Sequence, residues 1–306
     1  MNSSQIPENI TFSILMANFN NSKFIEEAIE SVLSQSYQYW ELIIVDDCST
    51  DKSIEKINPF LKDKRIKLIS NNSNLGYGGA LKTASDAANN EILAILDPDD
   101  KLHEKALEIM AKAYRENPDY GFIYSTTWSC DSELKNCKIV NWIGPDTPVK
   151  SNIFVPKISH LKTFRKDMYE KTTGFDPNQK RSVDKDIIYK LEEITKFKFV
   201  NVPLYYYRQH ESGISQGKNK FQARIYLYIA KCKAYRRRLN MNIPNISLEA
   251  LYLEYYKITF HSLINFGKFI NKVFNFYDLA AKILKKYPRL NNNIFRKFNF
   301  SKKKLV

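Results

Sequence analysis

Residues 92–96, Ile-Leu-Ala-Ile-Leu, form a short apolar run that stops at Asp97-Pro-Asp-Asp100. Such a run predicts a strand that is buried on both faces, as in a parallel sheet. Pro98 has no backbone N–H and a fixed φ, so the strand must end there and the acids lie in a turn. Ligands of open α/β sheets bind outside the carboxyl ends of the strands. Asp97, Asp99 and Asp100 are therefore candidate site residues.

The three carboxylates have two interpretations. Neighbouring carboxylates raise one another's pKa unless a cation joins them. Mg²⁺ and Mn²⁺ prefer oxygen ligands, usually carboxylates together with substrate phosphate oxygens. A solvated Asp-Pro turn explains the same residues equally well when they are taken alone.

The first hundred residues alternate between strand and helix patterns. Strands are expected at 12–17, 41–47, 66–69 and 92–96, and helices at 24–35, 51–61 and 81–89, with a polar loop at 71–79. This alternation predicts right-handed βαβ units and a parallel sheet. Further on, we expect a helix at 102–117, a strand at 122–124, an irregular stretch at 126–160 and a helix at 221–239.

Charge divides the chain into two regions. The net charge is +14, and residues 220–306 carry 19 Lys and Arg against 3 Asp and Glu. The preceding residues are close to neutral, which predicts two functional regions. A polar start and the lack of an 18-residue apolar run predict neither an export signal nor a membrane span. The four cysteines form no zinc pattern, so we expect free thiols in a reducing cytoplasm.

Several motifs in one order carry a family resemblance. They are Ile-Leu-Met-Ala-Asn-Phe-Asn at 14–20, Ala-Ile-Glu-Ser-Val-Leu-Ser-Gln-Ser-Tyr at 28–37, Glu-Leu-Ile-Ile-Val-Asp-Asp-Cys-Ser-Thr-Asp at 41–51, Asn-Leu-Gly-Tyr-Gly-Gly at 74–79 and Leu-Asp-Pro-Asp-Asp at 96–100. Over residues 11–216 the chain resembles family 2 glycosyltransferases with the GT-A fold. This implies an α/β, Rossmann-like, mainly parallel sheet flanked by helices.

The resemblance also implies a domain plan. A tail at 1–10 would precede a GT-A catalytic domain at 11–217. Residues 11–100 would form its nucleotide-binding half, and 101–217 its acceptor half. A basic, aromatic helical region would occupy 218–306.

For the donor, the resemblance implies a nucleotide site with Asp47 bound to the base, because a carboxylate can accept the imide N–H of uracil. The alternative is that Asp46 and Asp47 cap a helix. A Mn²⁺ or Mg²⁺ ion at Asp99 and His210 would bridge the donor diphosphate, as a Lewis acid does. The implied nucleotide-binding residues are Ala17, Asn18, Asn20, Asp46, Asp47, Asn74, Gly76 and Asp97.

For catalysis, the resemblance points to the segment Arg181-Ser-Val-Asp-Lys-Asp186. Asp184 would be the general base for the acceptor hydroxyl. The alternative is an acid stabilised by the helix dipole. Val183 replaces the usual Glu of the family pattern. Residues implied near the diphosphate or acceptor are Asp100, Asp186, Arg208 and Ser215.

Together these features predict an inverting, metal-assisted hexosyl- or N-acetylhexosaminyltransferase. Its donor would be a nucleotide sugar, with UDP favoured, and its acceptor a hydroxyl of a glycan or lipid-linked glycan. Two alternatives are a sugar-nucleotide-binding protein with little activity, if Val183 marks decay, and a nucleic-acid-binding protein using the basic tail. The acid clusters and the near-neutral first region argue against nucleic acid.

The basic tail itself has two interpretations. Its last 28 residues carry only positive charge, and 17 aromatic residues follow position 219. This composition suits peripheral contact with an anionic membrane on the cytoplasmic side. Alternatively, the tail helices pack on the catalytic domain or form a homo-oligomer, with their lysines facing water.

Overall fold

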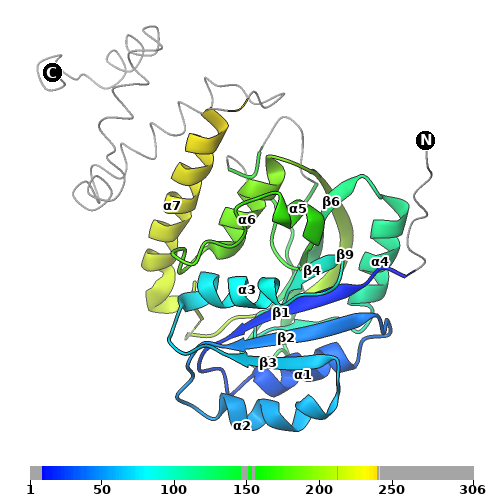
Figure 1. Cartoon of the computed structure of the whole chain (residues 1–306), viewed down its shortest axis with the longest axis vertical. Coiled ribbons are helices and arrows are strands. Elements are labelled where there is room, and N and C mark those ends of the chain that lie inside the picture. The colour runs from blue at the N-terminus through cyan, green and yellow to red at the C-terminus, as the bar shows by residue number, and fades with distance from the viewer. Residues whose placement is uncertain (1–8, 146–150, 154–155, 212, 240, 242–306) are drawn as a thin grey trace, which may run out of the picture. The chain divides into compact units, whose positions relative to one another are not determined.

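The computed structural model describes residues 9–145, 151–153, 156–211, 213–239 and 241 (Figure 1). The chain divides into two compact units, residues 1–243 and 244–306. The described residues all lie in the first unit, which includes the helix that follows residue 219. The functional division expected at residue 217 stays a prediction.

The described residues form a nine-stranded mixed sheet with the order β3-β2-β1-β4-β8-β6-β9-β5, and β7 pairs with β6. Strands β1 to β4 run parallel, β8 is antiparallel to β4 and β6, and β9 is parallel to β6. The strands are β1 Phe12–Asn18, β2 Trp40–Asp46, β3 Ile66–Ser70, β4 Ile92–Ile95, β5 Lys101–Leu102, β6 Tyr120–Cys130, β7 Cys137–Ile139, β8 Lys162–Arg165 and β9 Lys196–Arg208. The expected α/β architecture and its parallel first half are confirmed.

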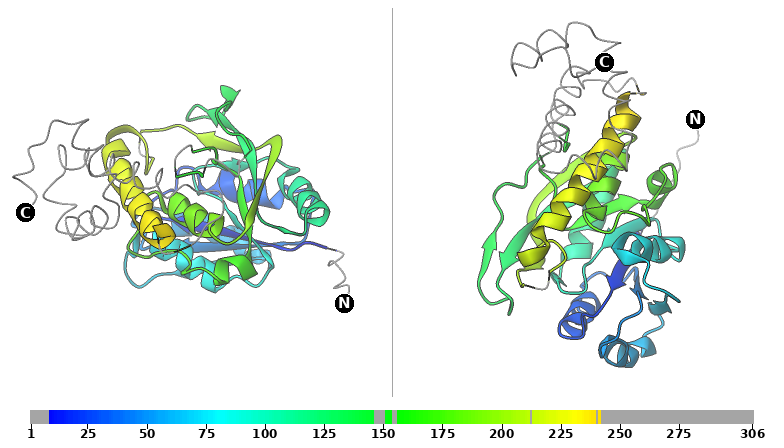
Figure 2. Two further views of the ribbon diagram at one scale, coloured as in Figure 1. Left: turned by 90° about the horizontal axis from the view of Figure 1, so that it is seen from above. Right: turned by 90° about the vertical axis from the view of Figure 1, so that its left-hand side faces the viewer.

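Helices cover both faces of this sheet. Figure 1 shows α3 on one face of β1 and β2, and α1 and α2 on the other. Figure 2 shows α7 alongside α6 from two further directions. The helices are α1 Ile25–Leu33, α2 Ser53–Ile57, α3 Gly76–Asp86, α4 Ala106–Glu116, α5 Lys166–Glu170, α6 Val183–Glu192 and α7 Lys220–Leu239, with short 3-10 helices at Asn58–Lys62 and Gly217–Asn219.

The core lies around β1 and β2, whose residues are all buried. Helix α1 covers one face with Ile25, Ala28, Ile29 and Val32, which follow the helical spacing expected from the sequence. Each fully buried aliphatic side chain contributes about 1.5–3 kcal/mol. This packing fixes the carboxyl ends of β1, β2 and β4 at one edge of the sheet, where the candidate acids lie.

The glycine-rich stretch expected to be a loop is partly helical. Helix α3 already begins at Gly76, whereas the sequence pattern predicted its start near residue 81. Gly78 explains the difference, because a Cβ there would lie 2.3 Å from the backbone oxygen of Asp176. The glycine therefore permits close helix packing rather than marking a turn.

Two further expectations are corrected. The predicted helix at 102–117 begins only at Ala106, because Lys101–Leu102 pairs with β9 as strand β5. The stretch expected to be irregular contains the end of β6 and all of β7. This hairpin places Cys130 opposite Cys137, and the two form a disulfide. The expectation of free thiols is therefore wrong for this pair, while Cys48 and Cys232 are free.

Helix α7 confirms the helix expected at 221–239, and its arginines are used internally. Arg238 is fully buried and pairs with Glu192 at 2.8 Å and with Glu193 at 3.0 Å. Arg237 pairs with Glu193 at 2.7 Å. At least two charges of the Arg236-Arg-Arg238 run are therefore neutralised inside the first unit. Among the described helices, none has the length and apolar character to cross a bilayer.

Candidate active site

The acid turn after β4 is held by β9. The backbone N–H of Asp97 donates to the Tyr205 hydroxyl at 3.1 Å, and that hydroxyl donates to Asp100 Oδ2 at 2.8 Å. The backbone N–H of Arg208 donates to Asp100 Oδ1 at 2.7 Å. Asp100 is buried and acts as the anchor of the turn, while Asp97 and Asp99 are partly accessible.

Burial and mutual repulsion dominate the electrostatics of this turn. Burial raises the pKa of Asp97 to about 6, with Lys162 opposing the shift and Asp99 adding to it. Burial, reinforced by Asp99 and Asp97, also raises the pKa of Asp100 well above its ordinary value. Three acids held this close favour a cation, which would neutralise them.

The second predicted metal ligand lies beside the first. His210 Nε2 is 2.8 Å from Asp99 Oδ2, and the imidazole packs against the Phe24 ring. Arg208 holds the backbone of Asp99 in place, because its Nε donates a hydrogen bond to the Asp99 backbone carbonyl at 2.6 Å. Its guanidinium also pairs with Glu27 at 2.6 Å and is 3% exposed, so it braces the turn.

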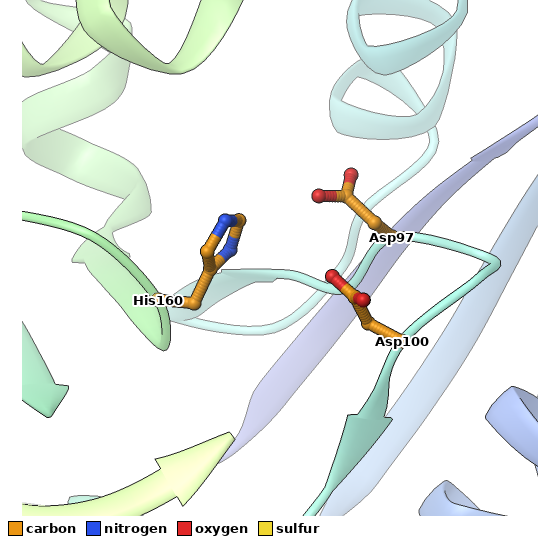
Figure 3. Close-up of side chains that lie close together, drawn as sticks. All are labelled: Asp97, Asp100 and His160. Carbon is orange, nitrogen blue, oxygen red and sulfur yellow. The ribbon is translucent and has the colours of Figure 1, made fainter. Parts of the chain in front are cut away.

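A second imidazole faces the acid turn. Figure 3 shows His160 opposite Asp97 and Asp100, and one ligand atom from each residue lies within 4.8 Å of the others. His160 is buried against the Tyr205 ring, and its Nδ1 has no hydrogen-bond partner among the described residues. Two carboxylates and an unpaired imidazole nitrogen fit a divalent cation such as Mn²⁺ or Mg²⁺.

The predicted base, Asp184, lies in the first turn of α6. Its Oδ2 is 3.1 Å from the ammonium of Lys162 on β8. Burial would raise the pKa of Asp184, but the charges of Lys162 and Lys185 outweigh it and hold the pKa well below the ordinary value. The carboxylate is therefore anionic at neutral pH.

The neighbours of Asp184 have other roles. Val183 is buried, so the residue that replaces the usual Glu packs in the interior. Asp186 is buried and lies 2.7 Å from the Lys190 ammonium. Ser215 is exposed and hydrogen-bonds the Tyr207 side chain.

The predicted nucleotide residues form two hydrogen-bonded groups. Asp47 accepts the backbone N–H groups of Leu75 and Gly76 at 2.8 and 2.7 Å, and the side-chain amide of Asn71 at 2.7 Å. Asn74 donates to the Asp47 carbonyl at 3.0 Å. Asp47 thus stabilises the start of α3, and three of its roughly four acceptor sites are used.

The other group lies at the end of β1. Asn18 donates to Asp46 at 2.7 Å and to Ser49 at 3.2 Å, while the Asn18 Oδ1 is buried without a partner among the described residues. Asn20 accepts the backbone N–H of Thr50 at 2.8 Å. Ala17 lies buried on β1 beside this group.

Sequence reasoning missed four side chains of the site. Tyr77 donates to Asp97 and thereby joins α3 to the acid turn. It lies within the quoted Asn-Leu-Gly-Tyr-Gly-Gly motif, which was the available signal. The other three are Tyr205 in β9, Lys162 at the start of β8 and His160 just before β8. Aromatic and basic residues in such apolar segments give no distinct sequence signal.

The sequence is similar to those of known glycosyltransferases. The model of the family described as "Glycosyl transferase family 2" matches residues 13–191. The colanic acid biosynthesis glycosyl transferase WcaA of Escherichia coli, itself named as putative, is 26% identical over 240 residues, which cover 70% of this chain and 86% of the relative.

Two solved structures share the fold. The Staphylococcus aureus TarS fragment 1–349 in complex with UDP-GlcNAc superposes with a TM-score of 0.66 at 17% identity, covering 86% of this chain and 78% of that one. Mannosyltransferase PcManGT from Pyrobaculum calidifontis, in complex with GDP-Man and Mn²⁺, gives 0.56 at 15% identity, covering 92% and 88%. Because the family model spans more than half of the sequence, the chain is a glycosyltransferase that belongs to glycosyl transferase family 2.

Proposed function

We propose that this glycosyltransferase transfers a sugar from a UDP-sugar to a hydroxyl of a glycan or lipid-linked glycan, with inversion at the anomeric carbon. The main support is that acids from two parts of the fold lie near each other. Asp97 and Asp99 follow β4, whereas Asp184 lies in the first turn of α6. Asp184 is close enough for its negative charge to raise the pKa of Asp97. One group would serve the donor and the other the acceptor.

The donor would bind at the ends of β1 and β2. TarS, a neighbour in fold, was solved with UDP and with UDP-GlcNAc, which supports a uridine nucleotide here. The remaining lone-pair position on the Asp47 carboxylate can accept a hydrogen bond from the base. The proposed donor residues are held in place by the contacts described above, which involve Asn20, Asp46, Asn74 and Gly76.

We propose that the cation binds at Asp99 and His210, next to Asp97, Asp100 and His160, whose ligand atoms lie within 4.8 Å of one another. Mn²⁺ or Mg²⁺ bound there would neutralise charge on the leaving diphosphate. The Mn²⁺ in the PcManGT complex supports this choice of chemistry. Arg208, braced by Glu27, keeps the Asp99 carbonyl in place and so orients the carboxylate.

Asp184 would take the proton of the acceptor hydroxyl as its oxygen bonds to the anomeric carbon. At the same time the bond from that carbon to the diphosphate oxygen breaks, and its electron pair leaves with the diphosphate. A single displacement on the face opposite to the leaving group inverts the configuration. The buried Val183 leaves Asp184 in place, so the absence of the family's Glu does not remove the base.

The proposal also includes the class of acceptor and the place where the enzyme works. WcaA is named for colanic acid biosynthesis, which supports a polysaccharide or lipid-linked glycan as acceptor. We further propose that the enzyme works at the cytoplasmic membrane face, with the basic tail making peripheral contact.

Incubating the full chain with Mn²⁺, a panel of nucleotide sugars and host-cell lipid extracts tests this function. Mass spectrometry should detect one hexose or N-acetylhexosamine added to a glycan or glycolipid. Product formation from GDP-sugars alone would contradict the choice of UDP. Release of free sugar as the sole product would instead favour a binding protein with weak hydrolysis.

A further inference from the structure

Lys162 is a buried cation whose role the proposed function leaves open. Its side chain is 1% exposed and lies on β8, in the middle of the sheet. A buried ammonium is costly unless it is paired and hydrogen-bonded. The hydrogen bond that it donates to Asp184, at 3.1 Å, ties it to the proposed base.

The sheet fixes where this ammonium lies. Lys162 is paired with Ile95 of β4 on one side and with Tyr124 of β6 on the other. Ile95 precedes Asp97 by two residues, so Lys162 departs from the sheet next to the strand that carries the donor acids. Asp184, in contrast, lies in the first turn of α6, a helix that packs against α7. The ion pair therefore connects the donor side of the site to the acceptor side.

We propose that Lys162 is the positioning residue of the catalytic base: its ammonium holds Oδ2 of Asp184 and thereby presents Oδ1 to the acceptor hydroxyl. This inference rests on the proposed role of Asp184. No hydrogen bond to Oδ1 of Asp184 is found among the described residues, and the Asp184 side chain is 24% exposed to solvent. One oxygen is thus anchored, and the other is available for a proton.

The surrounding charges show why a cation is needed at this point. Asp97 and Asp184 repel each other and Lys162 attracts both, while Lys185 and the buried His160 also act on Asp184. Tyr77 and Tyr189 face the same region, and burial raises the pKa of each hydroxyl, so both are neutral. Lys185 donates to the Ile158 carbonyl at 2.7 Å, which leaves Lys162 as the cation in direct contact.

The proton balance of the transfer is simple. The acceptor hydroxyl gives its proton to Asp184, whereas Lys162 keeps its own protons throughout. After the transfer, a charged Lys162 lies beside a neutral acid, and this arrangement favours release of the proton from Asp184 to solvent. Lys162 thus restores the base without taking part in the displacement.

The test compares Lys162→Met and Lys162→Arg with the wild-type full chain in the presence of Mn²⁺ and a UDP-sugar. Lys162→Met should lower kcat by about 10²-fold, the cost of a misplaced group, while UDP binding measured by calorimetry stays the same. The measurements are made at pH 8, where Asp97, whose pKa is raised to about 6, is ionised. Lys162→Arg keeps the charge and can still hold Oδ2 of Asp184, so part of kcat should return.

Lys82→Met is the matched control: Lys82 pairs with Asp86 at an exposed position, and its loss should change neither kcat nor UDP binding. If Lys162→Met fails to fold, Lys162→Gln replaces it; its side chain is shorter and uncharged, so kcat should again fall while UDP binding stays the same. Wild-type kcat in the folded neutral variant, or an equal fall of kcat in Lys162→Arg, overturns the inference while Asp184→Asn remains inactive. Full activity of Asp184→Asn would instead overturn the proposed base, and the inference with it.

Discussion

Oδ2 of Asp99 and Nε2 of His210 lie 2.8 Å apart, although 111 residues separate them in sequence. The contact joins the turn after β4 to the segment after β9. A hydrogen-bonded carboxylate and imidazole can open to admit a divalent cation between them, since both are common ligands. The pair is therefore the part of the site where metal dependence is best tested.

Removing the metal should abolish transfer. We expect EDTA to stop product formation and added Mn²⁺ or Mg²⁺ to restore it. Asp99→Asn and His210→Ala should each weaken metal-dependent UDP binding by about 10-fold or more, the scale of a lost ligand or its support. Calorimetry with and without Mn²⁺ measures this difference. The controls are Asp119→Asn, whose side chain is 79% exposed, and His103→Ala, whose ring stacks on Trp128. Full turnover in EDTA would refute the assignment.

Replacing the base should affect turnover rather than donor binding. Asp184→Asn keeps the shape of the side chain but cannot take a proton, so kcat should fall by about 10²- to 10⁴-fold. The UDP dissociation constant should stay the same, because Asp184 faces the acceptor side. Asp167→Asn, exposed on α5, is the matched control. Normal turnover by Asp184→Asn would show that another group is the base.

Asp47 should contribute to stability as well as to donor binding. Its carboxylate receives two backbone N–H groups at the start of α3 and the Asn71 amide. Asp47→Ala leaves these donors unpaired, so the free energy of unfolding should fall by about 1–3 kcal/mol. Urea denaturation measures the loss. Asp86→Asn, which breaks only the exposed pair with Lys82, should change stability by less than about 0.5 kcal/mol.

Asp97 should make the stability of the metal-free protein depend on pH. Burial raises its pKa from 3.8 to about 6, so between these values the folded state holds a proton that the unfolded state has lost. Stability must therefore fall as pH rises through this window. Relative to Asp97→Asn, the wild type should lose on the order of 1–3 kcal/mol between pH 4 and 6.5.

Added Mn²⁺ at pH 7 should reverse that loss in the wild type, because it binds the ionised acid. At about 100 times the dissociation constant it should add about 2.7 kcal/mol to the wild type and less to Asp97→Asn. Parallel pH curves for the two proteins would contradict the raised pKa of Asp97. Urea titrations at each pH supply both measurements.

The donor half was predictable because its signals are local. An apolar run followed by Asp97, and a similar run followed by Asp46, fix both the strands and the ends at which the acids lie. Helix α1 follows from the spacing of its apolar residues alone. The error at α3 has a tertiary cause, because the close approach of Asp176 to Gly78 cannot be seen in the sequence.

The acceptor half was less predictable because its contacts are long-range. Lys162 is an ordinary lysine in the sequence, and only the antiparallel pairing of β8 between β4 and β6 places it beside Asp184. The Cys130–Cys137 pair was missed for a similar reason, since it depends on a hairpin that the irregular composition hid. Asp186 and Arg208 match family motifs, yet their charges are neutralised inside the fold by Lys190 and Glu27.

Most of the basic tail, residues 220–306, lies outside the described residues. Residues 220–306 carry a balance of +16, but Arg237 and Arg238 are paired within the first unit. Lysines further along the chain, such as Lys257, Lys268, Lys272, Lys282 and Lys286, carry the remaining attraction together with the last three at 302–304. Each basic residue near an anionic surface contributes about 1 kcal/mol, so a few would give reversible binding.

We therefore expect the full chain to sediment with anionic vesicles and not with neutral ones. Salt should release it, because charges are screened over roughly 8 Å at physiological ionic strength. Deleting residues 291–306 should weaken binding, whereas Arg238→Met should reduce stability instead, because it removes the ion-pair partner of Glu192 and one of the two arginines that pair with Glu193. Equal sedimentation with both vesicle types would show that charge is not the cause. Absence of sedimentation, with a dimer seen by light scattering, would assign the tail to self-association.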